Sequence, residues 1–193
     1  MNIYIKYMVC MRCKMIVKKV LDDLGISYSK VDLGMAELKQ TISAQQKLKL
    51  KERLLSWGLD LLEDNKGILV EKIKSSIINM VRENSMICSF KTSHYLSQYL
   101  NYNYTYLANV FSQETGICLS DYIIAHKIEK AKEMLLYEDL TVSEIAWKLN
   151  YSSVAHLSNQ FTKVTGLRPS QFKKSTKKVF TPLEQVGIME MAS

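Results

Sequence analysis

LSQYLNY over Leu96–Tyr102 is repeated as IAWKLNY over Ile145–Tyr151, at an offset of 49 residues. One extra residue in the second copy then changes the offset to 50, and the second copy repeats the apolar, Thr-Gly and aromatic positions of the first. Leu107, Phe111, Thr115-Gly116 and Tyr122 correspond to Leu157, Phe161, Thr165-Gly166 and Phe172. Each copy has the pattern of a short apolar helix, a tight turn, a second helix and a glycine that ends it. This duplication decides the fold of the second half of the chain.

The turn residues of both copies support this pattern. Asn101 and Asn150 stand where the chain leaves the first helix, and asparagine tolerates the left-handed backbone that such a turn needs. Asn103 and the pair Ser152-Ser153 then offer side-chain oxygens that can cap the second helices. We therefore predict two helix-turn-helix units, at about 94–116 and 142–166, which can place two recognition helices on one face of DNA.

The second helix of each unit carries small or polar residues between its apolar positions, and such a face fits a major groove. Asn109 and Asn159 occupy equivalent positions, and asparagine pairs well with N6 and N7 of adenine. The candidate DNA-contacting residues of the two helices are Thr105, Tyr106, Asn109, Val154, Ala155, His156, Ser158 and Asn159.

Charge is unevenly distributed over the two units. Residues 85–140 hold four lysines and six acidic residues, a net charge of −2. Residues 163–178 hold six cations and no acid, namely Lys163, Arg168, Lys173, Lys174, Lys177 and Lys178. We expect the second unit, and Lys173 and Lys174 in particular, to supply most of the attraction to phosphates. The alternative is that this basic run is only a solvated face.

A single long helix is predicted between the two units, over residues 120–136. Ser120 is its expected N-cap, and the buried stripe is expected to consist of Ile124, Ile128, Ala131 and Leu135. At this point four motifs resemble the AraC/XylS-type DNA-binding domain: SDY at 120–122, IEKAK at 128–132, VSEIA at 142–146 and FTKVTGLRPSQF at 161–172. The resemblance covers residues 90–175, about half of the chain.

The resemblance implies an all-α double helix-turn-helix domain over residues 85–178, in which a linker helix joins the units. It further implies a bacterial, cytoplasmic transcription regulator that reads successive major grooves of double-stranded DNA, with RNA polymerase as a further partner. Asn109 and Asn159 depart from the family pattern, since many relatives carry arginine there. The alternative is an all-α packing domain with an accidental duplication.

Residues 1–65 have a different character, that of an α+β domain. Ile3, Ile5 and Tyr7 alternate as in a strand, and a helical stripe from Ile16 stops at Gly25. A hairpin is expected around Gly34. Apolar residues then recur at helical spacing and are followed by a short strand: Leu50, Leu54 and Trp57, then Leu59, Leu61 and Leu62. The order β-α-β-β-α-β predicts a ferredoxin-like arrangement.

In that arrangement the segment Met8–Cys13 (MVCMRC) forms the loop before the first helix, and it resembles the metal loop of heavy-metal-associated domains. Cys10 and Cys13 are the candidate ligands for Cu(I) or Zn(II), because thiolates are soft ligands and a helix N-terminus lowers a thiol pKa. No cofactor is required by this interpretation. Two alternatives stay open: a redox pair, which would want a cis-proline facing the thiols, and an inherited structural loop.

The remaining features bound the function. A connecting helix is expected over residues 66–84, with a stripe of Leu69, Ile73, Ile77, Met80 and Val81, and residues 179–193 form a tail without an assignable pattern. The chain has no run of 18 apolar residues and no signal-peptide core, which predicts a soluble intracellular protein without a membrane partner. The net charge of +7 agrees with nucleic-acid binding.

Two further expectations concern chemistry. Cys88 and Cys118 are isolated and are expected to be small core residues. The three histidines are scattered and no hydrolase, phosphate-loop or metalloprotease motif is present, so we do not expect an enzyme. The alternative function is a metal-binding, chaperone-like protein whose helical half is a protein-interaction module. The oligomeric state is not predicted.

Overall fold

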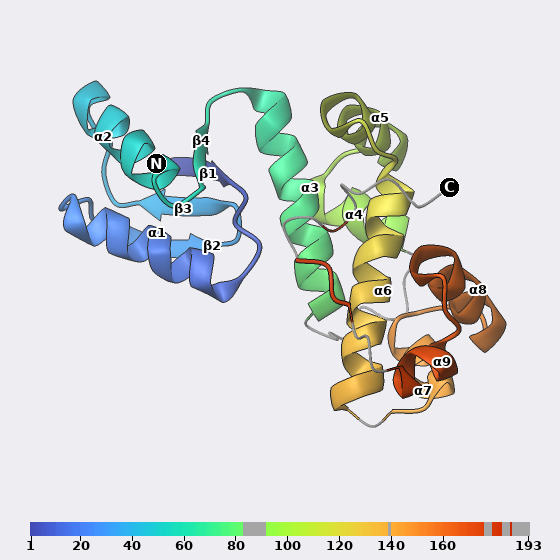
Figure 1. Ribbon diagram of the computed structural model, residues 1–193. Helices are drawn as coiled ribbons and strands as arrows, with labels where there is room; N and C mark the ends of the chain where they lie inside the picture. Colours follow the sequence, from blue (N-terminus) through green and yellow to red (C-terminus); the bar gives the residue numbers. More distant parts are fainter. Residues whose placement is uncertain (83–91, 139, 176–178, 183–185, 187–193) are drawn as a thin grey trace. The chain divides into compact units, whose positions relative to one another are not determined.

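The computed structural model describes residues 1–82, 92–138, 140–175, 179–182 and 186 (Figure 1). The chain divides into two compact units, Met1–Ser75 and Ser76–Ser193. The first unit contains a four-stranded sheet with helices, and the elements described in the second unit are helical. None of the helices in the described part of the chain has the length and apolar content needed to cross a lipid bilayer.

The first unit follows the predicted order of elements. These are β1 (Asn2–Lys6), α1 (Met11–Asp23), β2 (Tyr28–Asp32), β3 (Met35–Leu38), α2 (Ala44–Leu55) and β4 (Asp60–Leu62). The strands lie in the order β2-β3-β1-β4, and each neighbouring pair is antiparallel. This arrangement is compatible with the ferredoxin-like fold expected for residues 1–65.

The core of the first unit lies where α1 and α2 pack against the sheet. Alternation along β1 buries Ile3 and Ile5, and the helical stripes bury residues such as Leu21 and Leu50. Two expectations fail at element ends. Tyr7 follows β1 rather than extending it, adopts a φ of 70° and is 43% exposed, and Trp57 lies beyond the end of α2 and is 54% exposed. Periodicity does not locate an element end, because turn geometry decides it.

Helix α3 (Asn65–Arg82) begins in the first unit and ends in the second. Its middle, at Glu71 and Ser75, approaches the turn between β2 and β3 closely. Gly34 in this turn has a φ of +75°, which favours glycine, and a Cβ there would also come within 2.7 Å of Ser75 Oγ. The expected stripe of α3 is buried except at Met80, which is half-buried, and residues 83–84 of the predicted connecting helix lie outside the described residues.

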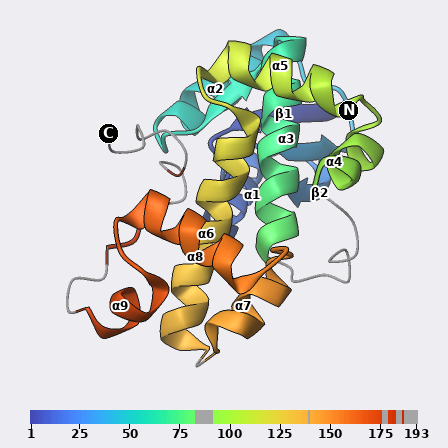
Figure 2. The same ribbon diagram turned by 90° about the vertical axis from the view of Figure 1, so that its right-hand side faces the viewer.

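The second unit is built around one long helix, α6 (Leu119–Tyr137). It packs against α5, α7, α8 and α9 (Figure 2). The other helices of this unit are α4 (Thr92–Leu100), α5 (Tyr104–Thr115), α7 (Val142–Lys148), α8 (Val154–Thr165) and α9 (Pro169–Lys174). The helix α6 therefore occupies the segment between the two copies of the repeat and holds both copies in one unit.

The start of α6 corrects two expectations. Its N-cap is Cys118 rather than Ser120, because the carbonyl of Cys118 already accepts hydrogen bonds from the backbone N–H groups of Asp121 and Tyr122. Cys118 is exposed, so it is not the core residue that was expected, and Cys88 lies outside the described residues. The expected stripe of α6 is buried at Ile128, Ala131 and Leu135 and half-buried at Ile124.

Candidate nucleic-acid interface

Both turns between paired helices have the predicted backbone conformation. Asn101, between α4 and α5, has a φ of 58°, and Asn150, between α7 and α8, has a φ of 55°. Both values lie in the left-handed region, which asparagine adopts more readily than other residues with a side chain. Gly116 and Gly166 end α5 and α8 with φ values of 76° and 74°. The two copies therefore share one turn geometry.

The caps of the second helices are also those that the sequence predicts. The side chain of Asn103 accepts a hydrogen bond from the backbone N–H of Thr105 at 2.8 Å. Ser153 accepts one from the backbone N–H of His156 at 3.1 Å. Such bonds satisfy N–H groups that the helix itself cannot pair, and they fix where each second helix begins.

Helix α7 of the second unit begins with a complete capping box. Thr141 Oγ1 accepts from the backbone N–H of Glu144 at 3.3 Å, and the Glu144 carboxylate accepts from the backbone N–H of Thr141 at 2.8 Å. Hydrogen bonds from the side chain and backbone of Thr141 hold the pKa of Glu144 below its usual value. This box fixes the start of the helix that supports α8.

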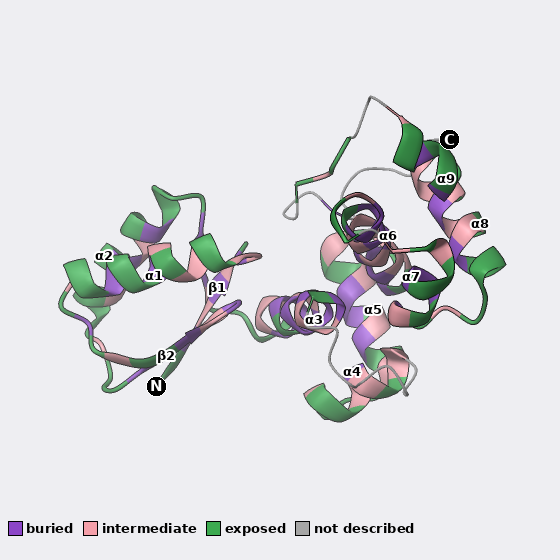
Figure 3. Ribbon diagram, turned by 90° about the horizontal axis from the view of Figure 1, so that it is seen from below, coloured by how far each residue is buried: buried purple, intermediate pink, exposed green. Residues whose placement is uncertain are grey.

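The second helices expose the same positions of the repeat. Leu107 and Phe111 in α5, like Leu157 and Phe161 in α8, are buried. Purple positions alternate with pink and green ones along α8 in Figure 3. At the offset of 50, three exposed residues of α5 match three exposed residues of α8: Thr105, Tyr106 and Asn109 correspond to Ala155, His156 and Asn159. Both helices thus present one equivalent stripe to solvent.

Three details modify the predicted residue set. Val154 is exposed as expected, but Ser158 is only half-buried, and its backbone carbonyl accepts a hydrogen bond from Thr162 at 2.8 Å. Gln113 and Lys163, one turn beyond the two asparagines, are exposed on the same stripes. Their spacing of four residues from Asn109 and Asn159 was a signal that could have added both to the candidate set.

The stripe of α8 is supported by the turn that precedes it. Ser152 Oγ lies 3.0 Å from His156 Nδ1, and the His156 ring meets Tyr151 edge-on at 5.2 Å between centroids. Lys127 of α6 places its ammonium group 5.2 Å from the centre of the Tyr151 ring. Burial raises the pKa of the Tyr151 hydroxyl far above its usual value, so Tyr151 stays neutral. These contacts orient His156 at the start of α8.

The two helix-turn-helix units differ sharply in charge. No lysine or arginine occurs between residues 92 and 126, so α4 and α5 carry no cation. The second helix-turn-helix unit exposes Lys163 at the end of α8 and is followed by exposed cations up to the end of α9: Arg168, Lys173 and Lys174. Exposed positive charge is therefore concentrated beside the second helix-turn-helix unit.

The helix α6 lies between the two helix-turn-helix units in the sequence, so its length limits how far apart the exposed stripes of α5 and α8 can be. Its 19 residues span about 28 Å at about 1.5 Å per residue. One turn of B-form DNA measures roughly 34 Å, so the joined units are on the scale of one helical turn.

The cysteine loop of the first unit brings its two thiols together. Cys10 is the N-cap of α1, and its Sγ atom lies 3.5 Å from Sγ of Cys13. Two thiolates on one tetrahedral zinc are separated by about 3.8 Å, so the pair could serve as two ligands after a small shift. Of the two methionines in the motif, Met8 is buried in the core and Met11 is exposed. Among the residues described, no group of three or more His, Cys, Asp and Glu side chains could hold a metal ion.

One electrostatic expectation for this loop is wrong. Burial raises the pKa of the Cys13 thiol above its usual value, although a bond from the backbone N–H of Val9 acts in the opposite direction. The predicted lowering by the helix N-terminus does not dominate at Cys13, because its sulfur lies inside the first turn and is partly removed from water.

Comparison with known proteins assigns the second unit. Residues 96–175 match the family model of a helix-turn-helix domain. The chain carries an AraC-type helix-turn-helix domain of the kind found in transcriptional regulators. It is 32% identical over 79 residues to the uncharacterized HTH-type transcriptional regulator YtdP of Bacillus subtilis, a match that covers 41% of this chain and 10% of that protein.

Two further relatives are also described as transcriptional regulators. The uncharacterized HTH-type transcriptional regulator YdiP of Escherichia coli is 27% identical over 62% of this chain and 37% of its own length. The uncharacterized transcriptional regulatory protein YesN of Bacillus subtilis is 39% identical over 37% of this chain and 20% of its own length. The chain thus spans only 10% to 37% of these three relatives. Among solved structures, the C-terminal domain of AraT, a response regulator from Geobacillus stearothermophilus, is 26% identical, with a TM-score of 0.49, over 60% of this chain and 91% of that chain.

Proposed function

We propose that this protein is a transcription regulator that binds double-stranded DNA with α5 and α8 as recognition helices in successive major grooves of one site. The equivalent exposed stripes of α5 and α8 carry this proposal. A helix whose apolar side is buried and whose small and polar side is exposed can enter a major groove, and α5 and α8 share this design. The domain match over residues 96–175 supports the same function.

Base recognition is assigned to the middle of each stripe. Asn109 and Asn159 are exposed at equivalent positions, and an asparagine amide can donate to N7 and accept from N6 of one adenine. The neighbouring residues differ between the helices, with Thr105 and Tyr106 in α5 against Ala155 and His156 in α8. The two segments of the DNA site should therefore share an adenine and differ around it.

We assign most of the DNA affinity to the second helix-turn-helix unit and the helix α9 that follows it. Because α4 and α5 carry no lysine or arginine, the first helix-turn-helix unit can add neutral hydrogen bonds but no charged phosphate contacts. The exposed cations of α9 lie just after the second recognition helix. The second helix-turn-helix unit should therefore bind DNA of any sequence, and the first should add discrimination between sequences.

Selection from a pool of random duplexes at low salt tests the proposal. The full chain should enrich a site with two conserved segments about 10 base pairs apart, as expected for two joined recognition helices. A chain with Asn109→Ala and Asn159→Ala should still bind duplexes, but the motif that it enriches should lack the shared adenine in both segments. If the wild-type chain enriches no motif, DNA reading by these helices is wrong.

A second proposed role concerns the thiol pair of the first unit, and the 3.5 Å between the sulfurs of Cys10 and Cys13 favours it. We propose that the two thiolates bind one soft metal ion, Cu(I) or Zn(II). Because the pKa of the Cys13 thiol is raised, metal must displace a proton already at neutral pH, so metal affinity should fall as pH decreases over the whole range below that pKa. Whether metal changes DNA binding is a separate claim, which requires reciprocal coupling of the two affinities.

Titration of the full chain with Cu(I) or Zn(II) tests the thiol pair. Wild type should bind one ion per chain, and a Cys10→Ser/Cys13→Ser variant should bind none at that affinity. Cys118→Ser is the matched control, because Cys118 is exposed and lies in the other unit. Equal metal binding by wild type and the double variant would reduce the loop to a structural element.

A further inference from the structure

A pocket opens within the second unit, between the end of α3 and one face of α6. Its volume is about 350 Å³, which is within the range of small-molecule sites. Four of its lining residues, His126, Glu129, Glu133 and Tyr137, follow one another along α6 at spacings of three or four residues, so they share one helix face. Neither the DNA-reading stripes nor the thiol pair uses this pocket.

A short segment near the C-terminus closes one side of the pocket. The backbone N–H of Thr181 donates to the Glu129 carboxylate at 3.3 Å, and Lys132 Nζ donates to the carbonyl of Val179 at 3.2 Å. Lys132 and Glu129 form an ion pair at 2.6 Å with side chains only 7% and 11% exposed. This buried pair fastens the segment to α6. Phe180 then stacks near Tyr137, with ring centroids 6.3 Å apart, and contributes an apolar wall.

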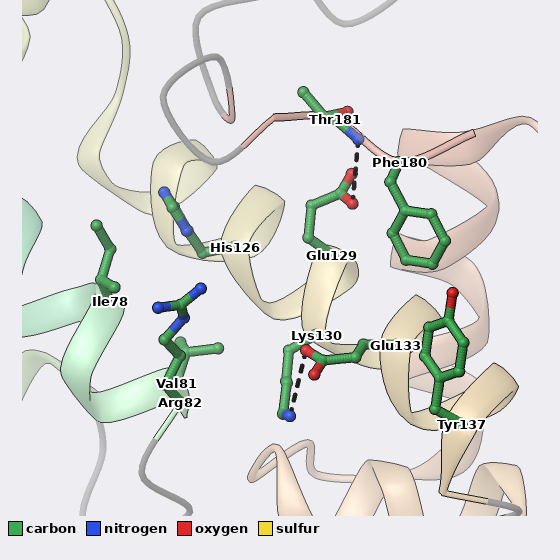
Figure 4. Close-up of a pocket in the computed structure, with 10 residues that line it drawn as sticks. All are labelled: Ile78, Val81, Arg82, His126, Glu129, Lys130, Glu133, Tyr137, Phe180 and Thr181. Carbon is green, nitrogen blue, oxygen red and sulfur yellow. Dashed lines mark hydrogen bonds and ion pairs between the residues drawn. The ribbon is translucent and has the colours of Figure 1, made fainter. Parts of the chain in front are cut away.

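Two cations and two acids line the pocket, namely Arg82, Lys130, Glu129 and Glu133. Glu129 is paired with Lys132, which lies outside the lining, and Lys130 is shared at 3.3 Å between Glu133 and Glu138. Arg82, from the last turn of α3, forms no ion pair within the described part of the chain, and it lines the pocket. Figure 4 draws the Arg82 guanidinium and the ring of His126 on one side of the pocket, with Phe180 and Tyr137 on the other. The pocket therefore has one side that carries the Arg82 guanidinium and an opposite side formed by two aromatic rings.

We propose that this pocket binds a small molecule with one anionic group and an apolar or aromatic body. The Arg82 guanidinium would hold the anion, a carboxylate or a phosphate monoester, through paired N–H donors. The aromatic side chains of Phe180 and Tyr137, together with Ile78 and Val81 of α3, would cover the body of the ligand. Binding at this pocket does not depend on the proposed reading of DNA.

Calorimetric titration of the full chain with benzoate and with phenyl phosphate tests the proposal, and benzyl alcohol serves as the neutral analogue. At least one anion should bind saturably with a stoichiometry of one, and benzyl alcohol should bind at least roughly tenfold more weakly, the factor expected for loss of a charged hydrogen bond. Tighter binding of benzoate would indicate that the pocket prefers a carboxylate, and tighter binding of phenyl phosphate would indicate a phosphate monoester.

Variants locate the binding. Arg82→Gln should weaken the anion by roughly tenfold to a hundredfold, and Phe180→Ala should weaken both the anion and the neutral analogue. Arg53→Gln is the matched control, since Arg53 is an exposed arginine in the last turn of α2 in the first unit. Binding of neither anion at millimolar concentration, or equal binding by wild type and Arg82→Gln, would overturn the proposal.

Discussion

Exchanging Lys173 and Lys174 for glutamine should remove about two phosphate contacts from the DNA complex. Both side chains are exposed in the last turn of α9. Each contact contributes about 0.9 to the slope of log affinity against log salt concentration, so the double variant should lower its magnitude by roughly 1.8. At about 0.1 M salt the same relation gives roughly 60-fold weaker binding, and the loss should be equal on preferred and random duplexes.

The matched control is Lys18→Gln/Lys19→Gln, which removes the same charge from two exposed lysines on α1 of the first unit. Fluorescence anisotropy of a labelled duplex, measured over a series of salt concentrations, gives the slope for each protein. The α1 variant should keep the wild-type slope. Equal slopes for the α9 variant and wild type, or equal reductions in both variants, would refute the assignment of phosphate contacts to α9, beside the second helix-turn-helix unit.

Three further predictions concern stability, and thermal or urea unfolding measures each. Thr141→Ala removes an N-cap and should cost about 1 kcal/mol. Lys132→Met leaves Glu129 charged and buried, so it should cost about 3–5 kcal/mol, and adding Glu129→Gln should recover most of that loss. Gly34→Ala should destabilise more than Gly25→Ala, because both have a positive φ but only a Cβ at Gly34 would clash with a serine hydroxyl of α3. A full-cost double variant at the buried pair, or equal losses at the two glycines, would contradict these explanations.

The features that the sequence predicted well are decided by local chemistry. Asn101 and Asn150 adopt the left-handed turn because few other side chains tolerate it, and Asn103 and Ser153 cap because their oxygens reach the first free N–H groups. The exposed stripes follow from helical periodicity once the buried positions are known. Each of these inferences needs only a few neighbouring residues.

The features that the sequence did not predict depend on surroundings. Trp57 continues an apolar period, yet the chain has already left the helix, and Ser120 looks like a cap although the carbonyl of Cys118 starts the helix. The pKa of Cys13 depends on how much water its sulfur keeps, which spacing does not reveal. The pocket beside Arg82 requires the end of α3, the face of α6 and the segment around Phe180 to meet. Contacts between segments that are this far apart in the sequence become visible only in the folded structure.

The most direct test of two recognition helices is a crossed measurement of DNA discrimination. Affinities of wild type, Asn109→Ala and Asn159→Ala are measured on the selected site and on sites with a base pair changed in either segment. Asn109→Ala should lose roughly 1–3 kcal/mol of discrimination in one segment only, and Asn159→Ala should lose it in the other segment only. Loss in the same segment for both variants, or uniform weakening on every site, would contradict the account.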